Sequence, residues 1–284
     1  MTNCFTAACI QNCAGPDLAA NIDDAVRLVR SARDAGAQFI VTPEFFSCLN
    51  KHGDRLEVGA HPESAHPALP VFQELARELD AWLGLGSLAI EDHEGRWRNR
   101  SFVIDVDGLI TARYDKIHMF DVDLPNGERY RESDLFTAGD EAVVARTPWG
   151  TLGLSVCYDL RFPHLYRALA QAGAQFIGVP AAFTKTTGEA HWHTLLRARA
   201  IENGCFILAP CQHGRHGDAA TYGHSLIVDP WGRVLADGGE DRGFIIAEID
   251  LHAVEKARNR IPALNHDRQF RQIDVAPRVS VVGG

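Results

Sequence analysis

The sequence predicts an α/β protein with mixed sheets and with helices packed outside them. Three observations carry this prediction. Segments of strand and helix character alternate from end to end, and helices that alternate with strands pack on the faces of a sheet. Asp107-Gly108, between two β-rich runs, is a hairpin turn, which adds antiparallel pairs. Hydrophobic residues make up 46% of the chain and charged residues 23%, as in globular proteins.

The first half of the chain alternates strands with two helices. Residues 18–35 carry apolar side chains at helical spacing, and Gly36 ends that helix. Residues 69–79 form the second expected helix. The expected strands are 5–10, 39–41, 82–88 and the hairpin 102–110.

The second half repeats this style. A pair of strands brackets the turn Pro148-Trp149-Gly150, and Pro163 opens a helix, because proline suits the first helical turn. The expected helices are 164–172 and 189–203; the expected strands are 142–145, 152–156, 175–180, 206–209, 225–229 and 243–249. No Pro/Gly/Ser-rich linker divides the chain, so we expect a single domain over residues 1–284.

Composition excludes several classes of function. The net charge of −9 leaves no basic stripe for phosphates, which argues against nucleic acid as a partner. No stretch is long and apolar enough to span a bilayer, so we expect no membrane partner. The start, Met1-Thr2-Asn3-Cys4, lacks the pattern of an export signal.

The cysteines and histidines indicate neither a disulfide framework nor a metal site. Seven cysteines is an odd number at scattered spacing in a large chain, which favours a reducing cytoplasm. His191-x-His193 and His213-x-x-His216 lack an accompanying ligand set, so hydrogen-bonded or solvated histidines are the expected interpretation. We therefore expect no metal and no cofactor.

Cys157 is the most informative residue. The apolar run 153–156 has strand character and ends at this cysteine, a polar turn follows, and Pro163 opens the next helix. Backbone N–H groups at such an edge point outward and can meet an oxyanion. A lone cysteine is usually a buried structural residue. This context instead favours a nucleophile.

Two other β-rich runs lead to charged residues. The run 39–42 leads to Glu44, and the run 109–112 leads to Lys116. Taken alone, each residue is best interpreted as part of a surface or helix-end salt bridge. Together with Cys157 they provide a base, a cation and a thiol at the ends of strands, which is what acyl transfer through a thioester requires.

In this order and in these contexts, Glu44, Lys116 and Cys157 resemble the nitrilase (carbon–nitrogen hydrolase) superfamily. The resemblance extends from the first strand to about Phe270. It implies a four-layer α-β-β-α sandwich. It also implies that Glu44, beside the apolar Phe45 and Phe46, takes the thiol proton. Lys116 would favour the thiolate and stabilise the oxyanion, together with a backbone N–H near Tyr158.

The family carries a second glutamate between the lysine and the cysteine. Glu128 and Glu132 are both candidates. We favour Glu132, because Arg-Glu-Ser just before a turn matches the pattern of relatives better. Its expected role is to orient Lys116 and the leaving ammonia.

The residues after the cysteine supply candidates for substrate binding. In relatives that act on carboxylated substrates, an arginine at the position of Arg161 faces the pocket; the alternative is a buried ion pair with Asp159. The polar loop 182–192 offers N–H groups and hydroxyls to a small anionic acyl group, although an N-cap role for Thr187 is the alternative. The expected substrate-binding residues are Tyr158, Arg161, Phe183 and Thr187.

The stretch 158–163, Tyr-Asp-Leu-Arg-Phe-Pro, resembles the Nit amidase branch, and Gly214-Arg215-His216 resembles its deaminated glutathione amidase subgroup more than its ω-amidase subgroup. The resemblance implies a cysteine-dependent amidohydrolase. With water, it would cleave a non-peptide amide of a small carboxylated substrate, either deaminated glutathione or a 2-oxoglutaramate-type ω-amide. Hydrolysis of an N-carbamoyl amino acid or an aliphatic nitrile is one alternative, and a non-catalytic binding subunit is another.

The helices 164–172 and 189–203 each carry small and apolar residues along one face. Such faces let helices approach closely. Because family members commonly pair through these helices, we expect a homodimer or a larger homo-oligomer. The tail 271–284 is expected to be loose or to contact the partner subunit.

Overall fold

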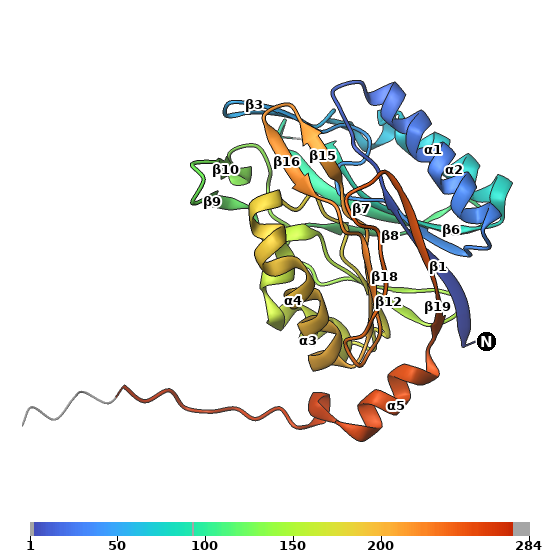
Figure 1. Cartoon of the computed structure of the whole chain (residues 1–284), viewed down its shortest axis with the longest axis vertical. Coiled ribbons are helices and arrows are strands. Elements are labelled where there is room, and N and C mark those ends of the chain that lie inside the picture. Colours follow the sequence, from blue (N-terminus) through green and yellow to red (C-terminus); the bar gives the residue numbers. More distant parts are fainter. Residues whose placement is uncertain (1–2, 93, 275–284) are drawn as a thin grey trace, which may run out of the picture.

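The computed structural model describes residues 3–92 and 94–274 and has two sheets stacked face to face (Figure 1). Helices α1 (Leu18–Asp34) and α2 (Ala68–Leu79) cover the outer face of the first sheet. Helices α3 (Pro163–Gln171) and α4 (Lys185–Asn203) cover the outer face of the second. The expected four-layer α-β-β-α sandwich is confirmed.

The first sheet has seven strands and is mixed. Its order is β19-β1-β2-β6-β7-β8, with β5 beside β6. Strands β1, β2 and β6 run parallel, whereas β19, β7 and β8 pair antiparallel with their neighbours. The bounds are β1 Cys4–Gln11, β2 Phe39–Val41, β5 His61–Pro62, β6 Trp82–Glu91, β7 Trp97–Ile104, β8 Ile110–Asp115 and β19 Gly243–Asp250.

The second sheet has six strands in the order β11-β12-β13-β14-β17-β18. Its centre, β12-β13-β14, is parallel and the flanking pairs are antiparallel. The bounds are β11 Val144–Arg146, β12 Thr151–Leu154, β13 Phe176–Gly178, β14 Phe206–Ala209, β17 Leu226–Val228 and β18 Val234–Asp237.

Successive side chains of β1 point alternately to the two faces of the first sheet and so pack in two different cores. Phe5, Ala7 and Cys9 belong to the core shared with the second sheet, while Ala8 and Ile10 pack toward α1 and α2. This is the two-residue period of a strand buried on both faces. Between the sheets, the rings of Phe5 and Trp149 stack with centroids 4.5 Å apart. The inter-sheet core therefore fixes how one sheet lies against the other.

Three short hairpins gather at one end of the sandwich (Figure 1). They are β3–β4 (Asn50–His52 and Arg55–Glu57), β9–β10 (Asp121–Asp123 and Arg129–Arg131) and β15–β16 (His213–His216 and Ala219–Tyr222). Helix α5 (His252–Arg260) follows β19. The sequence analysis did not assign these elements, because three- or four-residue strands that are partly exposed carry no clear hydrophobic period.

Helix α4 begins at Lys185 rather than at the predicted residue 189. The helix was predicted to begin after Gly188, because glycine is typical of loops. A Cβ at that position would lie 2.3 Å from the Tyr222 side chain, so the glycine serves a close approach of β16 to the helix. The expected polar loop 182–192 is therefore mostly the first turns of α4.

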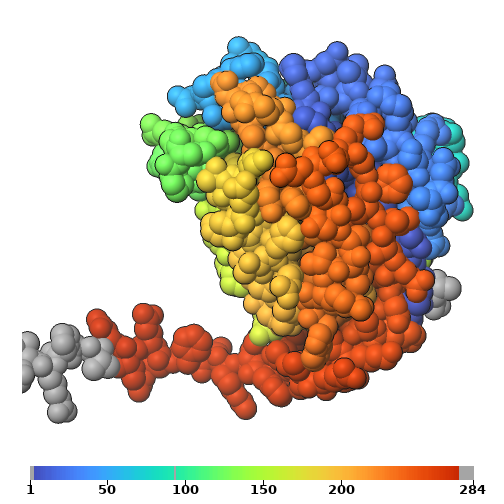
Figure 2. Space-filling model, in the orientation of Figure 1, coloured from blue at the N-terminus to red at the C-terminus, as the bar shows by residue number. Residues whose placement is uncertain are grey.

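Beyond α5 the chain leaves the body of the molecule (Figures 1 and 2). Residues 265–274 are exposed, and the Phe270 side chain is 92% exposed. Of the expected tail 271–284, residues 271–274 lie in this exposed segment, and the remainder lies outside the described residues. Among the described helices, none combines the length and apolar character needed to cross a membrane.

Candidate active site

A cavity of about 630 Å³ opens at the end of the sandwich where the three hairpins gather. Glu44, Lys116, Glu132 and Cys157 all line it. Its walls also include residues of each hairpin: Lys51, Arg55, Arg129, Tyr130, Arg131, His216, Ala219, Ala220 and Thr221. The rigid sheets thus supply one end of the cavity and the hairpins supply the other.

Cys157 lies where β12 gives way to a short 3-10 turn, Cys157–Arg161, and α3 then begins at Pro163. Its φ of 48° falls in the left-handed region that non-glycine residues rarely adopt. The Cys157 N–H donates to the Pro180 carbonyl at 2.9 Å. Within residues 3–92 and 94–274, the Tyr158 N–H donates to no group and is free to meet a ligand.

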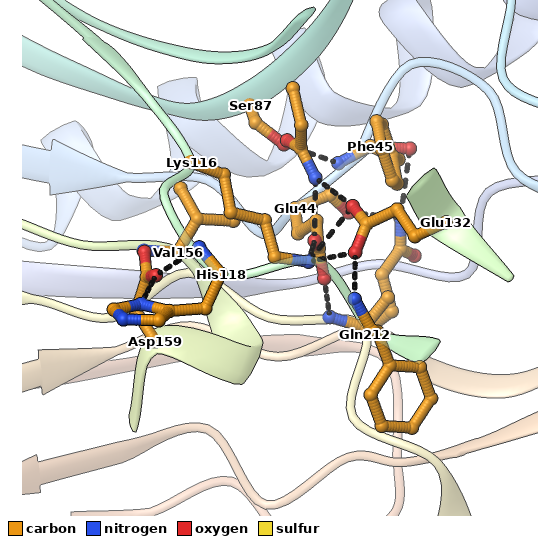
Figure 3. Close-up of polar contacts among 12 residues, drawn as sticks. Glu44, Phe45, Ser87, Lys116, His118, Glu132, Val156, Asp159 and Gln212 are labelled. Atoms are coloured by element: carbon orange, nitrogen blue, oxygen red, sulfur yellow. Dashed lines mark hydrogen bonds and ion pairs between the residues drawn. The ribbon is translucent and has the colours of Figure 1, made fainter. Parts of the chain in front are cut away.

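A buried carboxylate supports this turn from below. Asp159 is fully buried and accepts hydrogen bonds from the Val156 N–H at 2.9 Å and the Tyr114 hydroxyl at 2.6 Å. Its other oxygen lies 2.6 Å from Nδ1 of His118 (Figure 3). The unusual backbone of Cys157 is therefore held by groups on two other segments.

Lys116 lies between two glutamates (Figure 3). Its Nζ is 2.7 Å from Oε2 and 2.9 Å from Oε1 of Glu132, and 3.1 Å from Oε1 of Glu44. All three side chains are buried. Glu44 follows β2, Lys116 follows β8 and Glu132 follows β10, so three separate segments meet here.

Every carboxylate oxygen of this cluster has a donor. Asn99 Nδ2 donates to Oε1 of both Glu44 (2.9 Å) and Glu132 (3.0 Å). The Ala182 N–H donates to Glu44 Oε2 at 2.8 Å, and the Phe120 N–H donates to Glu132 Oε2 at 2.7 Å. Buried charges need such partners, because an unpaired buried charge is strongly unfavourable.

Burial and the neighbouring charges shift the pKa values of Cys157, Lys116 and Glu132. Burial, and then the negative charge of Glu44, raises the pKa of the Cys157 thiol well above its usual range, although Lys116 opposes the shift. Burial alone would lower the pKa of Lys116, but Glu132 and Glu44 outweigh it and raise that pKa. Burial also raises the pKa of Glu132 against the opposing effect of Lys116. At rest the thiol is thus protonated and the lysine charged.

The structure brings Glu132, and not Glu128, to Lys116. Glu128 is half-buried and lies just after the turn of the β9–β10 hairpin, where it accepts hydrogen bonds from Asn126 and from the Tyr130 hydroxyl, both at 2.8 Å. The preference for Glu132 drawn from the sequence therefore agrees with the geometry.

Of the four expected substrate-binding residues, Tyr158, Phe183 and Thr187 line the cavity. Thr187 lies in the first turn of α4, with its Oγ1 2.8 Å from that of Thr184. The alternative N-cap role for Thr187 is wrong, because Thr184 occupies the N-cap position.

The structure contradicts both expected positions of Arg161. It is absent from the described residues that line the cavity, and its guanidinium lies 3.3 Å from His191 Nδ1 and over the ring of Phe183. It forms no ion pair with Asp159, because that carboxylate is buried beneath the turn and already has its donors. The Arg161 guanidinium thus packs on two cavity-lining rings, those of Tyr158 and Phe183.

The sequence analysis missed Asn99 and Gln212. Asn99 lies in β7 between two arginines, a position with no motif to mark it. Gln212 Nε2 donates to the carbonyls of Glu44 and Phe45, both at 3.1 Å, and so supports Phe45, whose φ is 50°. Both act from segments distant in sequence, and no local pattern indicates such a contact.

Comparison with known proteins agrees with this geometry. The family model for carbon-nitrogen hydrolase matches residues 6–259. A deaminated glutathione amidase of Yersinia enterocolitica is 40% identical over 277 residues, covering 96% of each chain. The crystal structure of the Caenorhabditis elegans NitFhit protein has a TM-score of 0.85 at 37% identity, covering 94% of this chain and 66% of that one.

A third relative has a covalent adduct on its active-site cysteine. An amidase variant from Nesterenkonia sp. AN1, with a TM-score of 0.75, 25% identity and coverage of 92% of this chain and 96% of that one, shows the acetamide moiety of fluoroacetamide covalently added at its active-site cysteine. With a family model matching most of the chain and a relative of similar length at 40% identity, the chain belongs to the carbon–nitrogen hydrolase family.

Proposed function

We propose that this chain is an amidohydrolase that cleaves a linear amide of a small carboxylated substrate, with Cys157 as nucleophile, Glu44 as base and Lys116 as the stabilising cation. The observation that carries the proposal is the buried Glu44–Lys116–Glu132 cluster, which lines the same cavity as a cysteine held in a left-handed backbone conformation.

In the first half of the reaction, Glu44 takes the Cys157 proton as the sulfur attacks the amide carbon. The raised pKa of the thiol is why a neighbouring base is required. The developing oxyanion is stabilised by the Lys116 ammonium and the free Tyr158 N–H. When the intermediate collapses, Glu44 returns the proton to the leaving nitrogen and a thioester remains.

In the second half, Glu44 takes a proton from water, whose oxygen attacks the thioester carbon. The same two donors meet the second oxyanion. Collapse breaks the carbon–sulfur bond, the thiol recovers its proton, and the products are a carboxylic acid and ammonia or an amine. Glu132 does not touch the substrate in this scheme; it holds the Lys116 ammonium through two contacts of 2.7 and 2.9 Å.

Deaminated glutathione, or another amide of the 2-oxoglutaramate type, is the substrate class we propose. Relatives at 37–40% identity over 89–96% of this chain bear the name deaminated glutathione amidase. Outside the Glu44–Lys116–Glu132 cluster, the cavity wall carries four basic residues, Lys51, Arg55, Arg129 and Arg131, and two acidic ones, Asp54 and Asp134, a balance that favours an anionic substrate.

A panel assay tests the substrate class. Ammonia or amine release is measured with deaminated glutathione, 2-oxoglutaramate, an N-carbamoyl amino acid and an aliphatic nitrile. We expect the highest kcat/KM for one of the first two. A preference for the carbamoyl compound or the nitrile contradicts the substrate class, and no turnover of any compound favours the non-catalytic alternative.

We also propose a homodimer or larger assembly. On α4, Leu195 and Ala198 are half-buried and Ile201 is 52% exposed, close to Trp231, which is 57% exposed. On α3, by contrast, Leu165 and Leu169 are buried in the chain's own core, so they are not available for pairing. Sedimentation of dilute protein tests this proposal, and a fully active monomer contradicts it.

A cytoplasmic location is part of the same proposal. Its support is that all seven cysteines are free thiols, as in proteins of reducing compartments. Cell fractionation tests it, and enrichment outside the cytoplasm contradicts it.

A further inference from the structure

Outside the cavity, three side chains from separate segments converge on one point. His193 lies on α4, His224 follows β16, and Asp237 ends β18. His193 Nε2 is 3.1 Å from Asp237 Oδ2, and His224 Nδ1 is 2.9 Å from Asp237 Oδ1. Ligand atoms of all three lie within 4.8 Å of one another. None of the three is among the described residues that line the cavity.

The spacing of these atoms matches a metal centre. Nitrogen and oxygen ligands sit about 2.1 Å from zinc, so neighbouring ligands at angles of 90–110° lie about 2.9–3.4 Å apart. The two imidazole–carboxylate separations of 2.9 and 3.1 Å fall in this range. Two imidazoles and one carboxylate form a ligand set that suits zinc, nickel, cobalt or copper rather than calcium or magnesium.

Backbone and aromatic contacts hold two of the three side chains in place. The Gly239 N–H donates to Asp237 Oδ1 at 2.9 Å. The ring of Tyr222 stacks on His224 with centroids 4.4 Å apart.

Backbone contacts, in addition to the contacts of its ring, fix the position of His224. Its φ of 51° is left-handed, its N–H donates to the Gly239 carbonyl at 2.6 Å, and its own carbonyl accepts from Trp192 Nε1 at 2.7 Å. Trp192 immediately precedes His193, so backbone and side-chain contacts join the same two segments. The two histidines are half-buried and Asp237 is exposed, which leaves room for water on an ion.

We propose that His193, His224 and Asp237 bind one divalent transition-metal ion, such as Zn²⁺, which fastens α4 to the strands behind the cavity wall. The first turn of α4 contributes Thr187 to that wall, and the Tyr222 N–H donates to the Phe183 carbonyl at 2.9 Å. An ion bound by His193, His224 and Asp237 therefore stabilises the cavity wall from outside the cavity. The proposal does not depend on the proposed hydrolase chemistry.

Of the two histidine pairs considered in the sequence, only His193 belongs to this site. His191 contacts Arg161, and His216 contacts the Ala14 carbonyl and Thr221. The site could not be predicted from the sequence, because its three ligands lie 31 and 13 positions apart along the chain, without a spacing motif.

Zn²⁺ titration calorimetry of the metal-stripped Cys157→Ala chain tests the proposal, since this background removes the cavity thiol as a competing ligand. We expect one ion per chain, and Co²⁺ should give a spectrum without a sulfur charge-transfer band. The same measurement on Asp237→Asn, His193→Ala and His224→Asn should show affinity at least about 10-fold weaker, because even loss of a residue behind a ligand costs that much. Asparagine at 224 tolerates the left-handed backbone.

His191→Ala and His252→Ala are the matched controls, because they remove surface histidines outside the cluster. They should bind like the parent chain. Zn²⁺ should also raise the melting temperature of the parent but not of the Asp237→Asn variant, because an ion bound only to the folded state stabilises it. Absence of stoichiometric binding, or an Asp237→Asn chain that binds like the parent, overturns the proposal. Unchanged circular dichroism confirms that each variant is folded.

Discussion

The two ends of the cavity are built differently. At the Glu44–Lys116–Glu132 cluster every charge is buried and every carboxylate oxygen has a donor within 3.1 Å. At the hairpins, Arg55, Arg129 and Arg131 are exposed or half-exposed and pair with acidic residues of their own hairpin. Exposed pairs contribute little and rearrange readily. We therefore expect the rigid sheets to carry out the chemistry and the hairpins to determine the choice of substrate.

The largest effect is expected at the nucleophile. Cys157→Ala should abolish turnover while leaving the fold intact, because the change in volume is small. Intact-mass spectrometry with a slow substrate should show an acyl adduct on the wild type only. Turnover near the wild-type rate in the alanine variant would rule out the assigned nucleophile.

Lys116→Met keeps most of the stem and deletes the ammonium. Loss of one oxyanion contact typically lowers the rate about 100- to 1,000-fold, and we expect a loss in kcat of that order. The variant leaves Glu44 and Glu132 buried without their cation, so its melting temperature must be measured beside its rate. A folded variant with only a few-fold loss places Lys116 outside the chemistry.

Glu132→Gln, with Glu128→Gln as its matched control, tests the positioning role. We expect the first to lose at least about 10-fold in kcat, within the range for a contact that orients a charged group. The second should retain wild-type kcat, since Glu128 contacts Asn126 and Tyr130 rather than Lys116. The reverse order contradicts the assignment of Glu132.

We also expect the melting temperature of Glu132→Gln to depend on pH differently from that of the wild type. Burial raises the pKa of Glu132 above its ordinary value of 4.5, so the folded chain holds that proton more tightly than the unfolded chain. The stabilising contribution is therefore present below pH 4.5 and is lost as pH rises through the raised pKa. The melting temperature of Glu132→Gln minus that of the wild type should increase from pH 5 to pH 8. A difference that is constant across this range contradicts the raised pKa.

The smallest effects are expected at the hairpins. Lys51→Met or Arg55→Gln should raise KM a few-fold for a carboxylated substrate with kcat nearly unchanged, because exposed charges act through screened attraction. A neutral amide should show no change, and added salt should reduce the difference. A loss confined to kcat would show that the hairpins take part in the chemistry.

The sequence predicted the parts of the site that follow local rules. Glu44, Lys116 and Cys157 each follow a β-rich run, and strand ends meet where the sheets stack. Arg161 was misplaced because the direction of its side chain depends on the turn at 157–161, which hydrophobic spacing does not define. Asn99, Gln212 and the three hairpins could not be predicted, because their roles arise from contacts between distant segments.

The proposed base and the proposed nucleophile follow strands of different sheets. Glu44 follows β2 of the first sheet and Cys157 follows β12 of the second. The N–H of Ala182, in the segment between β13 and α4, donates to Glu44 at 2.8 Å. The packed core between the sheets, in which Phe5 stacks on Trp149, therefore sets the distance between Glu44 and Cys157 over which the proposed proton transfer takes place. A substitution that creates a cavity in this core, far from the substrate, should therefore slow the reaction although the chain still folds.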